Sequence, residues 1–140
     1  MTSYSSVANP QEMDLVFVVD SSDVVNWPQM IRLVTAMLGS FHISQDRTHV
    51  GFVVFSGNAK VSFGFNALQG ASYSRNGVEQ LIRRIPRLGG IQRRIDLAFD
   101  VTYKDLFSDA GGARATARKV TLMQYYVQRR LTREGTIPFR

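Results

Sequence analysis

Two runs of consecutive apolar residues dominate the first part of the chain. Residues 14–20 contain five apolar residues in a row before Asp20, and residues 48–55 contain a similar run. Strands with apolar side chains on both faces are typical of parallel sheets that are covered on both sides. The pattern therefore predicts central, parallel strands over these two segments.

Apolar residues at helical spacing predict three helices. The first spans residues 27–41, the second covers 78–85 and ends before Pro86, and the third covers 95–107. Asn26 is a suitable N-cap for the first helix, because its side chain can accept a hydrogen bond from a backbone N–H of the first turn. We interpret the apolar stripe of the first helix as the face that packs on the sheet.

Two further strands complete the predicted sheet. Residues 60–65 alternate between polar and apolar side chains, and only a short connection separates them from the preceding strand. A parallel return would need a dozen residues or more, so this strand is predicted to be antiparallel and at the edge. A last strand is predicted over residues 118–127. The order of elements predicts an α/β fold: a doubly wound, mostly parallel sheet with one antiparallel edge strand and helices on both faces.

Composition narrows the class of protein. The 140 residues suit one domain, and 44% of them are hydrophobic, which is enough for a core. Cysteine is absent, which excludes disulfides and thiolate metal sites. No apolar stretch approaches the roughly 20 residues that span a bilayer. The net charge of +6 arises entirely within residues 111–140, so nucleic acid is not the expected partner of the domain body.

The end of the first predicted strand carries the candidate chemistry. Ligands of open α/β sheets bind outside the carboxyl ends of the strands, which is where Asp20 and Ser22 stand. Their oxygens suit a hard cation. The alternative is that residues 20–23 only turn the chain and cap the next helix. This pattern alone favours neither interpretation.

Motifs for catalysis are lacking. The chain has two histidines and no cysteine, and the pair Gly89 and Gly90 lacks the spacing of a phosphate-binding loop. We therefore predict that the protein is not an enzyme.

Six segments of the chain carry a family likeness through their order and separation: 14–22, 48–56, 59–63, 85–90, 95–99 and 117–120. Together they resemble the von Willebrand factor type A (VWA) domain family, especially matrix and adhesion members of the collagen VI-like and matrilin-like type. The resemblance covers roughly residues 13–122. It implies a doubly wound sheet with one short antiparallel edge strand. It also implies protein–protein adhesion, often through a bound Mg²⁺ whose coordination a partner carboxylate completes.

The family's metal site uses an Asp-x-Ser-x-Ser loop, a threonine after a Gly-Gly turn, and an aspartate at the end of the fourth strand. Asp20 and Ser22 match the first two ligands. The other positions hold residues of a different kind: Val24, Gln92 or Arg93, and Tyr125 or Tyr126. The resemblance therefore implies a degenerate site that binds Mg²⁺ weakly if at all.

The same edge is the expected partner-binding surface, and we assign to it Asp23, Gln92, Arg93 and Arg94. Asp23 could add an acidic ligand or instead cap the helix. A sharper hypothesis is that Arg93 or Arg94 reaches Asp20 and takes the place of the metal as a fixed cation. The alternative is that both arginines are simply solvated.

These observations predict a lead-in over residues 1–13, an incomplete VWA domain over 14–127 that lacks the last strands, and a basic, divergent tail over 128–140. The predicted function is a non-enzymatic protein-interaction and adhesion module, with a matrix protein such as collagen as a candidate partner and self-association through the incomplete sheet edge. The alternative is a shortened remnant without metal-dependent adhesion that contacts anionic partners through its tail. The resemblance suggests an extracellular location, although no signal peptide is visible.

Overall fold

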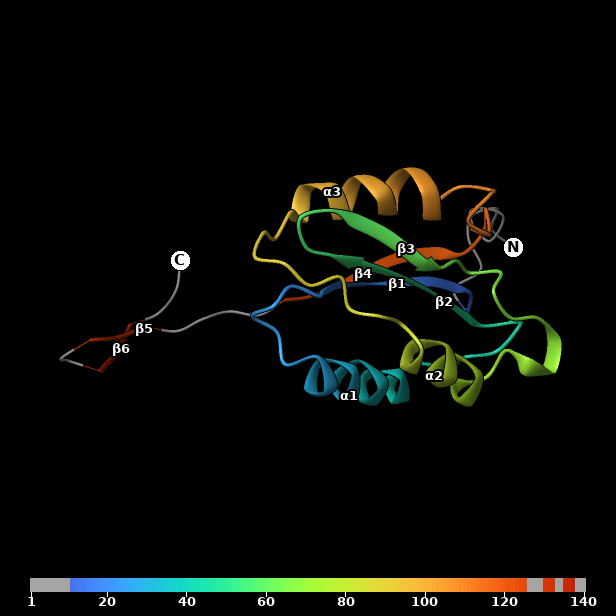
Figure 1. Ribbon diagram of the computed structural model, residues 1–140. Coiled ribbons are helices and arrows are strands. Elements are labelled where there is room, and N and C mark those ends of the chain that lie inside the picture. The colour runs from blue at the N-terminus through green and yellow to red at the C-terminus, as the bar shows by residue number, and fades with distance from the viewer. Residues whose placement is uncertain (1–10, 126–129, 133–134, 138–140) are drawn as a thin grey trace.

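The computed structural model describes residues 11–125, 130–132 and 135–137 (Figure 1). Its main sheet has the strand order β3-β2-β1-β4. The strands are β1 (Met13–Asp20), β2 (Thr48–Phe55), β3 (Ala59–Phe63) and β4 (Arg118–Gln124). β1 is parallel to both β2 and β4, whereas β3 is antiparallel to β2. The predicted mostly parallel sheet with one antiparallel edge strand is confirmed.

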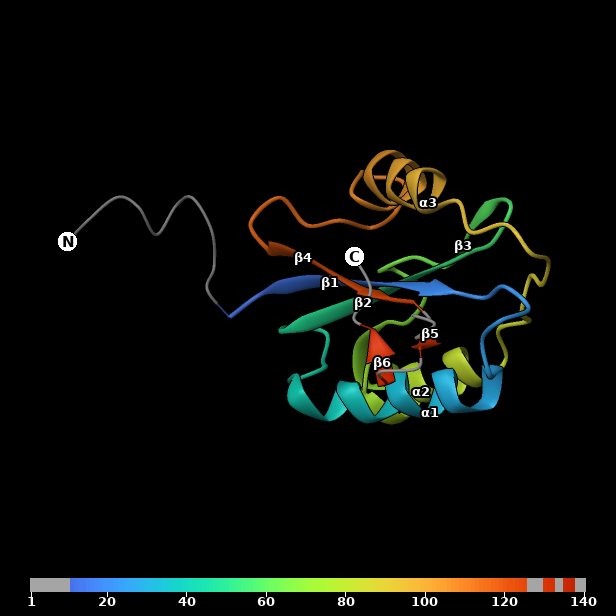
Figure 2. The same cartoon turned by 90° about the vertical axis from the view of Figure 1, so that its left-hand side faces the viewer.

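Helices cover both faces of this sheet, as predicted. One face carries α1 and α2 and the other carries α3, which Figures 1 and 2 show from two directions. The helical elements are α1 (Trp27–Met37), η2 (Leu38–Ser40), η3 (Gly70–Ser72), α2 (Arg75–Arg83), α3 (Ile95–Val101) and η4 (Thr102–Leu106). The last of these is a π-helical turn that continues α3. No helix in the described part of the chain is long and apolar enough to cross a membrane.

The apolar runs of β1 and β2 explain this layered arrangement. Every residue of β2 is buried, and so is every residue of β1 except Met13. Successive side chains of a strand point to opposite faces, so Phe17 packs in the core under α1 and α2 while Val16 and Val18 pack in the core under α3. Two separate cores therefore hold β1 between them, and its carboxyl end is fixed in place.

The structure differs from the sequence-based expectation in several places. The last strand, predicted over residues 118–127, ends at Gln124 as β4. The segment 66–73, predicted as loop, contains the short helix η3. Two short strands, β5 (Arg130–Thr132) and β6 (Gly135–Ile137), pair with each other in a separate two-stranded sheet that the sequence pattern did not predict. The predicted lead-in and basic tail lie largely outside the described residues.

Candidate functional site

The loop that follows β1 is tied tightly to its neighbours. Asp20, Ser21 and Ser22 are all fully buried. The backbone N–H of Ser22 donates to Asp20 Oδ1 at 2.9 Å, and both the backbone N–H and the hydroxyl of Ser21 donate to the carbonyl oxygen of Phe55, at 2.8 and 3.0 Å. Asp20 therefore does turn the chain. The cap of α1 is instead Asn26, which accepts from the N–H of Gln29 at 3.2 Å as predicted.

A second loop, which contains Gly89 and Gly90, lies against the first. Gly89 donates its N–H to the carbonyl oxygen of Ser21, and Asp23 donates its N–H to that of Gly90, both at 2.8 Å. The two glycines have φ angles of +74° and +95°, in the region that glycine adopts at little cost. These backbone contacts bring the segment after Gly90 to the carboxyl end of β1.

The structure places Arg93 directly on Asp20. Arg93 Nε lies 2.7 Å from Asp20 Oδ2, and the Arg93 side chain remains 31% exposed. Both oxygens of the carboxylate therefore accept hydrogen bonds, one from Arg93 and one from Ser22. Charge-assisted bonds of this kind are roughly twice as strong as neutral ones.

Arg94 points elsewhere. Its guanidinium pairs with the Asp96 carboxylate at 2.7 and 2.9 Å, and this pairing lowers the pKa of Asp96 to about 2. Its backbone N–H donates to the carbonyl oxygen of Ser56 at 2.7 Å. Of the two arginines considered from the sequence, the structure brings only Arg93 to Asp20.

Arg87 also stabilises this edge, and the sequence analysis did not identify it. Its Nη2 donates to the carbonyl oxygens of Ser22 and Val25, so one side chain holds both ends of the turn that leads into α1. No local pattern marks this role, because the contact joins residues more than sixty positions apart.

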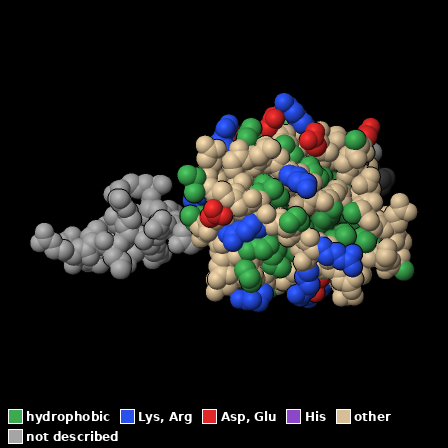
Figure 3. All heavy atoms as spheres, in the orientation of Figure 1, with side chains coloured by type: hydrophobic (Ala, Val, Ile, Leu, Met, Phe, Trp, Pro, Cys, Tyr) green, Lys and Arg blue, Asp and Glu red, His purple; other side chains and the backbone are tan. Residues whose placement is uncertain are grey.

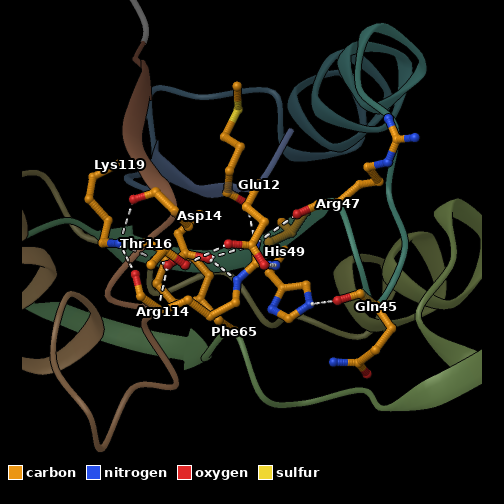
Figure 4. A network of polar contacts seen from close by, with 12 residues as sticks. Glu12, Asp14, Gln45, Arg47, His49, Phe65, Arg114, Thr116 and Lys119 are labelled. Carbon is orange, nitrogen blue, oxygen red and sulfur yellow. Dashed lines mark hydrogen bonds and ion pairs between the residues drawn. The ribbon is translucent and has the colours of Figure 1, made fainter. Parts of the chain in front are cut away.

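A second polar network lies at the opposite end of the sheet, where β1 and β4 begin (Figure 4). The buried Asp14 carboxylate accepts from Arg114 Nε at 3.0 Å and from the Arg114 backbone N–H at 2.8 Å, and it lies 3.2 Å from Lys119 Nζ. Arg114 Nη2 also donates to the carbonyl oxygens of Met13 and Arg47, at 2.8 and 2.7 Å. This network joins the starts of β1 and β4 to the segment that enters β2.

The model of the von Willebrand factor type A domain matches residues 14–124, which is most of the chain. The chain belongs to the VWA family. Over 113 residues it is 26% identical to integrin alpha-1 of Gallus gallus, a match that covers 80% of this chain and 38% of the integrin.

Solved structures support the same fold. A structure of proximal thread matrix protein 1 from the mussel byssus superposes with a TM-score of 0.73 at 20% identity, covering 83% of this chain and 31% of that one. A second structure of that protein, with a zinc-occupied MIDAS motif, gives a TM-score of 0.71 at 19% identity and covers 85% of this chain and 30% of that one. This VWA chain thus spans about a third of the length of these relatives.

The residues of this VWA domain do not fit the family's metal ion. Asp20 is already paired with a cation, and Val24, at the second serine position, has no oxygen in its side chain and is 44% exposed. Ser22 Oγ is buried with no hydrogen-bond partner in the described part of the chain, so it is the one unpaired side-chain oxygen at the three positions of the Asp-x-Ser-x-Ser loop. No cluster of three or more acidic, histidine or cysteine residues that could hold a metal occurs among the described residues.

The remaining predicted site residues lie around this centre without entering it. Asp23 is exposed, with its carboxylate beside Gly89. Gln92 is exposed and lies over Gly57. Tyr125 is exposed and, together with Val24, lines a hollow of about 290 Å³ between α1 and the end of β4. Tyr126 lies outside the described residues.

Proposed function

We propose that this chain is a non-enzymatic protein-interaction module of the VWA family that binds its partner without a metal ion. Arg93 takes the place of the metal as a fixed cation, and the partner surface comprises residues 20–24, the segment 88–94 and Tyr125. The observation that supports this most directly is the 2.7 Å pair between Arg93 and the buried Asp20. A divalent ion beside that guanidinium would experience like-charge repulsion, and its carboxylate ligand is already engaged.

The charge of this edge differs from that of a metal-bound one. One aspartate with one arginine is neutral, whereas one aspartate with Mg²⁺ carries a net positive charge. A neutral centre does not attract an acidic partner group strongly, so other contacts must contribute more to binding.

Exposed apolar side chains supply such contacts. Seven large hydrophobic residues of the described chain are exposed, and four belong to the loops of this edge: Val24, Leu88, Ile91 and Tyr125. Ile91, next to the glycine pair, is 86% exposed. Figure 3 shows hydrophobic side chains interspersed with Lys and Arg on one face of the molecule. Exposed apolar groups that gather in one region commonly mark protein–protein contact sites.

The metal-free part of the proposal is tested by restoring the family's ligands. Calorimetric titration of the wild type with Mg²⁺ and Mn²⁺ should show no binding. The double variant Val24→Ser/Arg93→Thr supplies two further oxygens and removes the cation, so it should gain measurable binding. The single variant Val24→Ser is the matched control, because it adds a hydroxyl but keeps Arg93. Binding by the wild type itself would contradict the proposal.

The interaction itself is tested on immobilised collagen, the matrix candidate that the resemblance suggests. Binding should be the same in Mg²⁺ and in EDTA, and Ile91→Ser should weaken it. Phe99→Ser, an exposed aromatic position on α3, is the control that should leave it unchanged. A requirement for Mg²⁺ would refute metal-free recognition, and absence of binding under both conditions would reject collagen as the partner. Contact with anionic partners through residues 128–140 involves side chains outside the described residues and stays a prediction.

A further inference from the structure

A hollow of about 220 Å³ lies between β3 and the carboxyl end of α2 (Figure 1). Most of its lining is apolar and comes from β2, β3, α2 and the segment after α2: Val54, Phe63, Leu81, Ile85 and Pro86. Val54 and Ile85 belong to the core, whereas Phe63 and Leu81 are half-buried and Pro86 is exposed. The core therefore opens to solvent beside this edge strand.

Two cations border the hollow without a carboxylate of their own. Lys60 on β3 and Arg84 at the end of α2 both line it, and both are exposed. The acid of α2, Glu79, is already engaged, because it lies 3.1 Å from Arg75 and 4.0 Å from Arg83. Among the residues that the structure describes, neither Lys60 nor Arg84 forms an ion pair. Both charges are therefore available to a ligand.

The size and charge of the hollow define the kind of ligand that fits. Small-molecule sites typically enclose about 300–1,000 Å³, so about 220 Å³ suits one or two side chains of a polypeptide rather than a whole cofactor. All of the lining except Val54 comes from residues 56–65 and 75–88, which together contain five basic residues and one acidic residue. This excess favours an anionic ligand. A glycan with charges alone would leave the apolar lining uncovered.

We propose that this hollow binds a segment of a partner protein in which apolar side chains alternate with acidic ones. The apolar side chain packs on Phe63 and Leu81, and the acidic neighbours pair with Lys60 and Arg84. Complementary charge selects such a partner. Leu88 lines the hollow and also belongs to the partner surface proposed above, so one partner can contact both. The inference rests on the chain being a protein-interaction module, but it requires neither collagen nor the absence of a metal ion.

Fluorescence anisotropy of the 140-residue chain with a labelled peptide, Glu-Leu-Glu-Phe-Glu-Leu-Glu, tests the proposal. The wild type should bind it saturably. An exposed charge pair changes affinity by up to about fivefold, so Lys60→Gln/Arg84→Gln should weaken binding by roughly tenfold. The matched control, Arg32→Gln/Lys104→Gln, removes the same charge from exposed positions on α1 and η4 and should leave the affinity nearly unchanged. Absence of binding by the wild type, or an equal loss in the two double variants, would overturn the proposal.

The apolar part of the recognition is tested separately. A peptide with Ser in place of Leu and Phe keeps every carboxylate but should bind much more weakly, and equal binding would show that the site attracts any polyanion and would overturn the proposal. Ser62→Phe fills the hollow without changing its charge and should also weaken binding, with urea unfolding as the check that the variant is folded.

One further variant separates this site from the partner surface proposed above. Ile91→Ser should weaken contact at that surface but leave peptide binding unchanged, because Ile91 does not line the hollow. Failure of the peptide to bind would then reject the hollow alone and not the surface around Arg93. A loss in Ile91→Ser as large as that in Lys60→Gln/Arg84→Gln would place the peptide outside the hollow and overturn the proposal.

Discussion

Two buried aspartates, Asp14 and Asp20, stand near the two ends of β1, and each is paired with an arginine, yet their surroundings differ. Asp14 contacts Arg114 through both side chain and backbone and also contacts Lys119. Asp20 accepts from Arg93 and from the N–H of its own loop. The Arg114 side chain is 19% exposed and that of Arg93 is 31% exposed. The same kind of ion pair is therefore largely enclosed at the start of β1 and partly exposed to solvent at its carboxyl end.

The largest expected effect on stability comes from removing the Asp14 carboxylate. Asp14→Ala leaves Arg114 and Lys119 without their buried carboxylate, and breaking such a pair typically costs about 3–5 kcal/mol. The free energy of unfolding, measured with urea, should fall by that order. Asp20→Ala is the matched comparison and should cost clearly less, because water can reach Arg93. If both variants lose the same free energy of unfolding, the proposed difference between the Asp14 and Asp20 ion pairs is wrong.

A smaller effect on stability is expected at Tyr73, which lies at the same end of the sheet as Asp14. Its hydroxyl donates to the carbonyl oxygen of Phe65 at 2.7 Å and accepts from the N–H of Val50 at 2.8 Å, and both bonds are buried. Tyr73→Phe leaves two buried backbone groups unsatisfied, which should lower stability by about 1–3 kcal/mol. Tyr103→Phe, an exposed tyrosine beyond α3, should change it little. Urea unfolding of both variants decides whether the Asp14 end is a general anchor of the fold.

The smallest effect is the dependence on pH. His49 stacks on Tyr73 with ring centroids 4.2 Å apart, and burial lowers the pKa of His49 below its usual value. The unfolded chain then binds the proton more readily, so the His49 contribution is present above about pH 6.5 and is lost as the pH falls. The groups that act on its charge are Arg114, Asp14 and Glu12.

The difference in unfolding free energy between wild type and His49→Gln isolates this contribution from that of the carboxylates. It should shrink between pH 7 and pH 5, by up to about 1.4 kcal/mol for each unit by which the pKa is lowered. A difference that is constant with pH would show that His49 does not titrate with folding. No comparable histidine lies at the Asp20 end among the described residues, so acid should weaken the two ends unequally.

Much of the fold was predictable because it depends on local patterns. The apolar runs of β1 and β2 and the stripe of α1 each indicate their own element, and the short connection before β3 requires an antiparallel pair. The position of Asp20 and Ser22 followed from the strand end. The pairing of Asp20 was open between Arg93 and Arg94, because only the course of the loop after Gly90 decides which guanidinium points inward.

The sequence by itself determined the order along the chain of the four main-sheet strands and the three α-helices, the buried character of the central strands, and the residues at the carboxyl end of β1. These follow from the spacing of apolar side chains, which is a local property. Only the tertiary structure decided that Arg114 meets Asp14 across 100 positions and that Arg87 holds the turn before α1. It also decided that Lys119 turns back onto Asp14. Contacts between distant segments depend on how loops place side chains in space, and no periodicity along the chain records that placement.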